Sequence, residues 1–311
     1  MANTLTPLDA KTRRKGFGPL VRKDLINGLL FISPWIVGFI VFQAYPVLAS
    51  LYYSFTNYDI VSPPKFAGLS NYVEMFTTDP NYFRVVRNTL FYALIAIPLN
   101  MLMAVCIAML LNQKVRGLSF FRTLFFLPSV VPEIASALLW AWILNPQFGL
   151  INNVLKLLGI PTVGWMADPN WAKPGLILIG LWGFGGSMVI YLASLQDIPR
   201  QLYEAADIDG ANSWQKTFAI TIPMLTPTIF FNLVLGIIGA LQYFTTAFVL
   251  SGPAGSTTFY SLHIFSYAFT YFRMGYASAL AWVLFAAVLL ITLVLFKTSG
   301  RWVYYEGDKP E

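Results

Sequence analysis

Long apolar stretches with few or no charged residues alternate with short polar segments along this chain. A helix rises about 1.5 Å per residue and needs about 20 apolar residues to cross the hydrocarbon core of a bilayer. The stretches that reach this length are residues 25–55, 89–111, 120–144, 175–195, 223–250 and 277–296. The pattern therefore predicts an all-α membrane protein with six transmembrane helices.

The distribution of basic residues predicts which side of the membrane each loop faces, because Lys and Arg resist translocation. Fourteen of the 20 Lys and Arg residues lie in the termini, in the loop after the second stretch and in the loop after the fourth. The remaining six lie in the other loops: Lys65, Arg84, Arg87, Lys156, Lys173 and Arg273. We therefore predict a basic cytoplasmic segment (1–24), a transmembrane domain (25–297) and a cytoplasmic tail (298–311).

The composition excludes several classes of protein. Hydrophobic residues make up 57% of the chain and charged residues only 11%, against about 25% charged in soluble domains. The net charge of +6 follows from the loops, so it does not indicate nucleic-acid binding. A single cysteine, Cys106, and a single histidine, His263, exclude an internal disulfide, a Cys/His metal site and most nucleophile-plus-base pairs. We expect no enzyme activity from this chain.

A polar stretch at residues 197–222 lies between the fourth and fifth apolar stretches, on the predicted cytoplasmic side. Pro199 suits the first turn of a helix and Gly210 a left-handed C-terminal residue, so we expect a helix of about three turns between them. Ser213 can cap a second short helix. The apolar face predicted for the first helix consists of Ile198, Leu202 and Ala205 or Ala206.

This stretch resembles a known motif. Glu204-Ala205-Ala206, then Gly210, then Ile222-Pro223 are similar to the EAA loop of permease subunits of binding-protein-dependent ABC importers. In that family the EAA helix lies in a cleft of an ATPase subunit and transmits its closure. The resemblance therefore implies docking roles for Glu204, Ala205, Ala206, Asp209, Gly210 and Pro223. The alternative is a solvated loop with helix propensity.

The resemblance covers most of the chain from the second stretch onward. Residues 122–144 and 275–286 are similar to segments of the carbohydrate-type branch, which includes the maltose and glycerol-3-phosphate permeases. One departure is Ser251-Gly252-Pro253, where the family commonly has a Thr-x-Gly-Gly-Pro sequence. The resemblance implies import of a sugar or oligosaccharide across a bacterial or archaeal inner membrane, with glycerol phosphodiesters or phosphates as the next choice.

The resemblance also implies partners. They are a second homologous permease subunit, two ATPase subunits and an extracytoplasmic solute-binding protein. The sequence has no GxxxxGK[ST] phosphate-binding loop, which ATP-hydrolysing subunits of this kind carry. We therefore expect this chain to bind no cofactor, and ATP and Mg²⁺ to be used by the ATPase subunits.

Polar residues within the apolar stretches are candidates for the substrate pathway, because they are costly at bilayer depth. Glu133 lies 11 residues beyond Arg122, which on a continuous helix places it about 16 Å further along, near the midplane. It is interpreted either as a carboxylate that lines the pathway or as a hydrogen-bonding group between helices.

The fifth stretch holds further candidates. Gln242, Tyr243 and Thr246 combine an aromatic ring with hydrogen-bonding groups, as sugar recognition requires. On a helix, Gln242 and Thr246 would share one face. Packing between helices is an equally good explanation for each residue.

A partner-independent secondary transporter or channel is the main alternative function. It would use intramembrane ionisable residues and inverted repeats. Glu133 is the single strong candidate of that kind, and no clear repeat is visible. An intramembrane enzyme fits less well, because His263 lies in the predicted outer loop before the last stretch.

Overall fold

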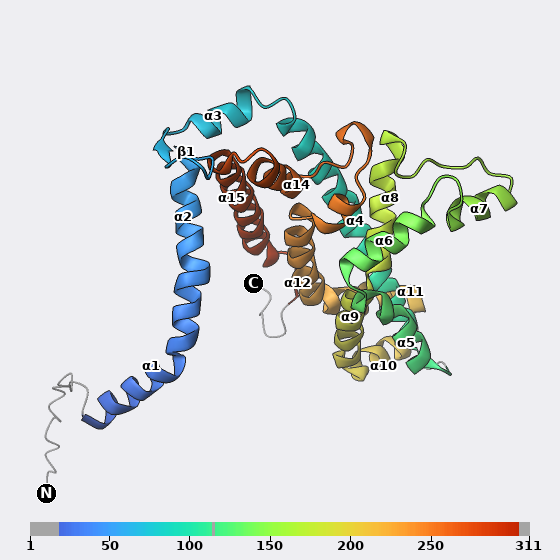
Figure 1. Ribbon diagram of the computed structural model, residues 1–311. Helices are drawn as coiled ribbons and strands as arrows, with labels where there is room; N and C mark the ends of the chain where they lie inside the picture. The colour runs from blue at the N-terminus through green and yellow to red at the C-terminus, as the bar shows by residue number, and fades with distance from the viewer. Residues whose placement is uncertain (1–18, 114–115, 305–311) are drawn as a thin grey trace, which may run out of the picture. The chain divides into compact units, whose positions relative to one another are not determined.

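The computed structural model describes residues 19–113 and 116–304 (Figure 1). Among them, four helices are long and apolar enough to cross a membrane, and six if each of two bent helix pairs counts as one span. The six-span prediction is confirmed in this form. Most of the predicted N-terminal segment and the end of the predicted tail lie outside the described residues.

The described part of the N-terminal unit is a long helix. It consists of α1 (Pro19–Phe39), the π-helical turn η1 (Ile40–Ala44) and most of α2 (Tyr45–Ser54). Apolar side chains such as Phe31 and Phe42 are exposed within it. A helix that is apolar all round fits a lipid surrounding.

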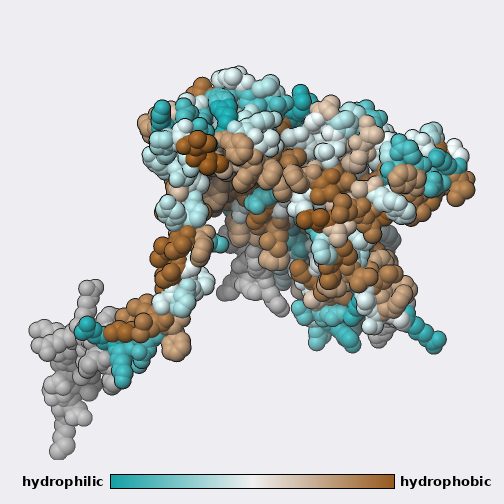
Figure 2. All heavy atoms as spheres, viewed as in Figure 1, coloured by the Kyte–Doolittle hydropathy of each residue, from teal (hydrophilic) through white to brown (hydrophobic). Residues whose placement is uncertain are grey.

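The second unit is built around α4 (Tyr82–Leu111), which packs against α8 (Pro169–Trp182), α9 (Gly185–Asp197) and α12 (Ile222–Leu241). Its main core contains Tyr92, Leu176 and Leu241. Hydrophobic side chains form a belt across the middle of this unit, and hydrophilic ones gather at its two ends (Figure 2). The belt is the surface that a bilayer would cover.

The third and fourth spans are broken. The third runs through α5 (Leu118–Phe126) and the 3₁₀ turn η2 (Leu127–Val130), then bends by 100° into α6 (Glu133–Ile143). Pro128 and Pro132 flank the bend, and proline cannot continue a helix regularly. The continuous helix that placed Glu133 about 16 Å beyond Arg122 is therefore wrong, because Glu133 begins a new helix.

The fourth span bends by 46° between α8 and α9. The glycines at this bend allow a close approach between helices. A Cβ atom on Gly185 would lie 2.4 Å from the Phe125 carbonyl oxygen, so α5 packs directly on the α9 backbone here.

The predicted outer end contains short elements. A small antiparallel hairpin, β1 (Thr56–Asn57) and β2 (Lys65–Phe66), is followed by α3 (Ser70–Thr77), and α7 (Leu150–Leu157) leads towards α8. After α12 come α13 (Thr245–Val249), the 3₁₀ turn η4 (Pro253–Gly255), α14 (Tyr260–Phe265) and the π-helical turn η5 (Ser266–Thr270). The last span is α15 (Met274–Ser299).

A buried carboxylate joins these outer elements. Asp79, between α3 and α4, lies 2.8 Å from His263 Nε2 and accepts a 2.8 Å hydrogen bond from the Tyr276 hydroxyl. Burial alone would raise the pKa of Asp79, but the hydrogen bonds from the Asn81 backbone N–H, Tyr276 and His263 outweigh it, so this pKa is lowered. His263 is thus a structural partner of Asp79.

Candidate docking helices and translocation cavity

The polar stretch folds as two short helices, α10 (Arg200–Ile208) and α11 (Ser213–Lys216). Gly210 adopts φ +75°, as expected for a left-handed residue after a helix. The N-cap of α11 is Asn212 and not Ser213. Asn212 forms a reciprocal capping box with Gln215, and this pair satisfies two backbone donors at once.

The inward face of α10 differs from the predicted one. Ile198 is buried, and the Tyr203 hydroxyl lies 2.9 Å from Thr221 Oγ1. Leu202, expected on the apolar face, is exposed. Of the two alternatives for that face, Ala205 is exposed and Ala206 is half-buried. The hydrogen bond of Tyr203 fixes the rotation of α10, and an ion pair between Lys216 and Asp207 holds α10 to α11.

The outward face of this pair combines carboxylates with large apolar side chains. Glu204, Ala205, Asp209 and Gly210 are exposed, Ala206 is half-buried, and Pro223 lies in the first turn of α12. Beside them Ile208 is 88% exposed, Trp214 73% and Phe218 66%. Apolar exposure of this kind marks a contact with another protein or with the membrane. The motif did not include Ile208, Trp214 or Phe218, although each is an apolar residue in a polar stretch.

One helical path joins this surface to the interior of the unit. From α11 the chain continues through the π-helical turn η3 (Thr217–Thr221) directly into α12, which ends at Leu241. Trp214 and Phe218 lie at one end of this path, and Asn232 and Gly236 line a cavity near the other. α11 and the cavity wall thus belong to one continuous helical path.

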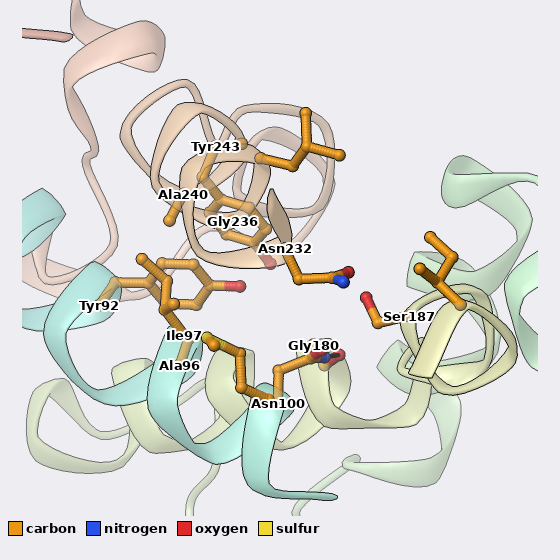
Figure 3. Close-up of a pocket in the computed structure, with 14 residues that line it drawn as sticks. Tyr92, Ala96, Ile97, Asn100, Gly180, Ser187, Asn232, Gly236, Ala240 and Tyr243 are labelled. Carbon is orange, nitrogen blue, oxygen red and sulfur yellow. Dashed lines mark hydrogen bonds between the residues drawn. The ribbon is translucent and has the colours of Figure 1, made fainter. Parts of the chain in front are cut away.

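The cavity has a volume of about 350 Å³ and lies between α4, the α8–α9 pair and α12 (Figure 3). The Tyr92 and Tyr243 rings stack with centroids 4.3 Å apart. The Tyr243 hydroxyl is buried and has no hydrogen-bond partner among the described residues. A buried hydroxyl without a regular hydrogen bond is costly, and Tyr92 and Thr246 are the polar neighbours of this one.

Polar side chains complete the cavity wall. Asn100 Nδ2 donates to the Gly180 carbonyl at 3.2 Å, and Asn232 Nδ2 donates to the Thr228 carbonyl at 2.9 Å. Ser187 also lines the wall. Aromatic rings with a few convergent polar groups are typical of a small-molecule site.

A second cavity of about 250 Å³ lies next to the first and shares Gly180 and Tyr243 with it. It is lined by residues at the three helix breaks: the α5–α6 bend, the α8–α9 bend and the end of α12. Here Thr246 Oγ1 donates to Glu133 Oε1 at 3.1 Å. The structure thus brings together Glu133, Tyr243 and Thr246.

Gln242 lies apart from this group. It lines a different cavity of about 330 Å³ with Ser261 and Phe285. The expected common face of Gln242 and Thr246 is wrong, because α12 ends at Leu241 and a new helix starts at Thr245. Helical spacing does not apply across that break.

Residues 96–303 match the family of binding-protein-dependent transport system inner membrane components. The chain belongs to this family. It is 47% identical to the probable ABC transporter permease protein YesP of Bacillus subtilis, over 93% of this chain and 95% of that protein. It is 36% identical to the lactose transport system permease protein LacF of Rhizobium radiobacter, over 87% of this chain and 93% of that protein.

The fold is also similar to a solved structure. That protein is a chain of a bacterial alginate ABC transporter in complex with an alginate pentasaccharide-bound periplasmic protein. The TM-score is 0.79 at 26% identity, with 90% of this chain and 95% of that chain covered. The present chain is therefore a multi-pass permease subunit of an ABC importer in the inner membrane. It is a transport subunit and not an enzyme, and it works with ATPase subunits and a solute-binding protein.

Proposed function

We propose that this chain forms, with a second homologous permease subunit, the pathway for a carbohydrate that a solute-binding protein delivers. The proposal rests on one observation above all. A single helical path links an exposed partner surface on α11 to an aromatic, polar cavity. A small movement of a rigid element is the usual way in which a remote event reaches a site.

The cavity walls support a sugar as the solute. The stacked Tyr92 and Tyr243 rings offer an aromatic face, and Asn100, Asn232 and Ser187 offer hydrogen-bonding groups. Sugars present both apolar C–H faces and hydroxyls, so they suit this combination. The named substrates of relatives, lactose and alginate, point to the same class.

The position of Glu133 supports a role in the pathway. Glu133 is exposed on this chain, in an otherwise apolar span and in the first turn of α6. A carboxylate that faces lipid costs about 3 kcal/mol or more, and non-helical backbone at membrane depth is tolerated where it lines a water-filled cavity or lies against protein. We assign Glu133 and Thr246 to the wall of the pathway.

The surface of α10 and α11 supports ATPase docking. Glu204 and Asp209 provide charge, and Ile208, Trp214 and Phe218 provide apolar contact area. A buried apolar centre with a polar rim is the usual anatomy of a protein interface. ATP and Mg²⁺ would be held by the ATPase subunits alone.

The test is uptake by the reconstituted complex of this chain, its partner permease and the ATPase subunits in liposomes. With the cognate solute-binding protein present, labelled oligosaccharide should accumulate only when ATP is supplied. Uptake without ATPase subunits, driven by an ion gradient, would instead indicate a secondary transporter.

A further inference from the structure

Three basic side chains come together at the ends of α4 and α8 that lie opposite the docking helices. Arg84 and Arg87 belong to the first turns of α4, and Lys173 belongs to the start of α8. Arg84 Nη1 donates to the Ala254 carbonyl at 3.4 Å, and Lys173 Nζ donates to Asn88 Oδ1 at 3.1 Å. Arg87 directly precedes Asn88 and lies three residues after Arg84 on α4, a spacing that makes two side chains neighbours on a helix surface. We call Arg84, Arg87 and Lys173 the outer basic cluster.

No carboxylate among the described residues forms an ion pair with this cluster. The acidic residues of the outer loops are all engaged elsewhere. Asp59 accepts from the Ser62 N–H at 2.7 Å, Glu74 from Arg273 at 2.6 Å, and Asp168 from the Asn170 N–H at 2.8 Å, while Asp79 lies 2.8 Å from His263 Nε2. The cluster therefore carries uncompensated positive charge.

The backbone beside the cluster is held in place. Asn88 Nδ2 donates to the carbonyls of Gly255 and Thr258, each at 3.1 Å. Ala254 is exposed at φ +53°, a strained conformation for a residue other than glycine. This is the loop in which the sequence departs from the family's Thr-x-Gly-Gly-Pro pattern. A loop fixed before binding loses little entropy when a partner docks on it.

The cluster lies above the cavity on α4. Asn88 is one turn from Tyr92, and positions four residues apart share a helix face. Tyr92 and, two turns further, Asn100 line the cavity wall. A protein that contacts the cluster would therefore lie close to the end of the helix that forms one wall of the cavity.

We propose that the outer basic cluster binds an acidic patch on the solute-binding protein. Arg84 and Arg87 are exposed and can reach a partner. Complementary charges of this kind increase the rate of association and set the orientation of docking, and salt weakens them. The inference rests on the dependence of this family on a solute-binding protein, and it adds the surface and the charge that such a protein must match.

The experiment uses the complete transporter in nanodiscs of zwitterionic lipid. ATP hydrolysis is measured against the concentration of solute-binding protein, loaded and unloaded, at 50 and about 300 mM salt. We expect Arg87→Glu, and more strongly Arg84→Glu with Arg87→Glu, to raise the half-maximal concentration by about tenfold at low salt and to flatten its salt dependence. Arg84→Gln with Arg87→Gln should give a smaller shift.

Lys156→Glu is the matched control, because it makes the same charge change on α7, away from the cluster (Figure 1). Its half-maximal concentration should stay near that of the wild type. Hydrolysis without the solute-binding protein verifies assembly of each variant.

Each other outcome overturns the proposal in a distinguishable way. An unchanged half-maximal concentration and salt dependence in the double Glu variant would contradict this inference alone. An effect seen only with anionic lipid would identify a headgroup site, and one seen only with a negatively charged sugar would identify a substrate site. If the solute-binding protein did not stimulate ATP hydrolysis by the wild-type complex, the proposed function would be contradicted as well.

Discussion

The two ends of the α11–η3–α12 path have opposite surroundings. At the cytoplasmic end Trp214 and Phe218 are exposed and stack on each other, with ring planes 13° apart. At the other end Leu241 is buried, and the chain turns beside the stacked Tyr92 and Tyr243. One helix thus presents a surface suited to a protein and walls suited to a small molecule. Changes at the first end should alter coupling to ATP, and changes at the second should alter solute handling.

The largest expected effect is at the cytoplasmic end. Glu204→Lys should weaken ATPase binding by at least about tenfold, because it reverses an exposed charge within the proposed interface. Co-purification of the ATPase subunits and uptake per complex measure it. Gln196→Lys, an exposed site at the end of α9, is the control and should behave as wild type. Normal uptake by Glu204→Lys would contradict ATPase docking at α10.

At the cavity end, Tyr243→Ala should lower uptake about tenfold while the ATPase subunits stay bound. It removes one ring of the stacked pair and a buried hydroxyl, and such aromatic contacts contribute about 1 kcal/mol beyond area alone. Tyr243→Phe keeps the ring and should have a smaller effect. Gln242→Ala is the control, because Gln242 lines a separate cavity. Equal losses for Gln242→Ala and Tyr243→Ala would contradict the placement of the pathway.

The hydrogen bond between Thr246 and Glu133 gives a second test at the cavity end of the helical path. Glu133→Ala and Thr246→Ala should each reduce uptake severalfold. The fold-loss of uptake in the double variant should be smaller than the product of the two single fold-losses, which corresponds to a coupling of about 1 kcal/mol. The measurement is a double-mutant cycle on uptake. ATP hydrolysis without the solute-binding protein serves as the reference. Additive losses would show that the two side chains act independently.

The sequence predicted the features that depend on neighbouring residues and missed those that depend on where a helix breaks. The six apolar stretches and Gly210 were predictable, because hydrophobic length and a left-handed residue after a helix are local properties. The relation of Gln242 to Thr246 was not, because helical spacing assumed a continuous helix, whereas α12 ends at Leu241 and a new helix starts at Thr245. Glu133 was misplaced along its span for the same reason, since Pro128 and Pro132 break it.

Other features depend on contacts between distant residues. The outward position of Leu202 follows from the bond between Tyr203 and Thr221, which no local pattern contains. Tyr92 and Asn100 line the cavity with residues more than 80 positions away, such as Ser187. The sequence marks them as residues of an apolar span, and only the packing of α4 against α9 and α12 makes them a wall.

The smallest expected effect is at Asp79, which lies outside the α11–η3–α12 path. Because the folded-state pKa of Asp79 is lowered below 3.8, its ionised form contributes stability above the unfolded pKa, and this contribution is lost as pH falls through the folded pKa. Thermal unfolding of the complex should shift down by a few degrees between about pH 5 and pH 3. Asp79→Asn should be less stable at pH 5 and less sensitive to this change. An identical pH response in both would contradict the role of Asp79.

A crosslink from the end of α10 measures directly whether an ATPase subunit docks on this helix. In a Cys106→Ser background, which removes the single cysteine, Ile208→Cys places a thiol on the exposed surface of α10. We expect this thiol to crosslink to an ATPase subunit in the transporting complex, with a yield that changes with bound nucleotide. A thiol that stays open to a water-soluble maleimide and forms no crosslink, while uptake proceeds normally, would contradict this docking.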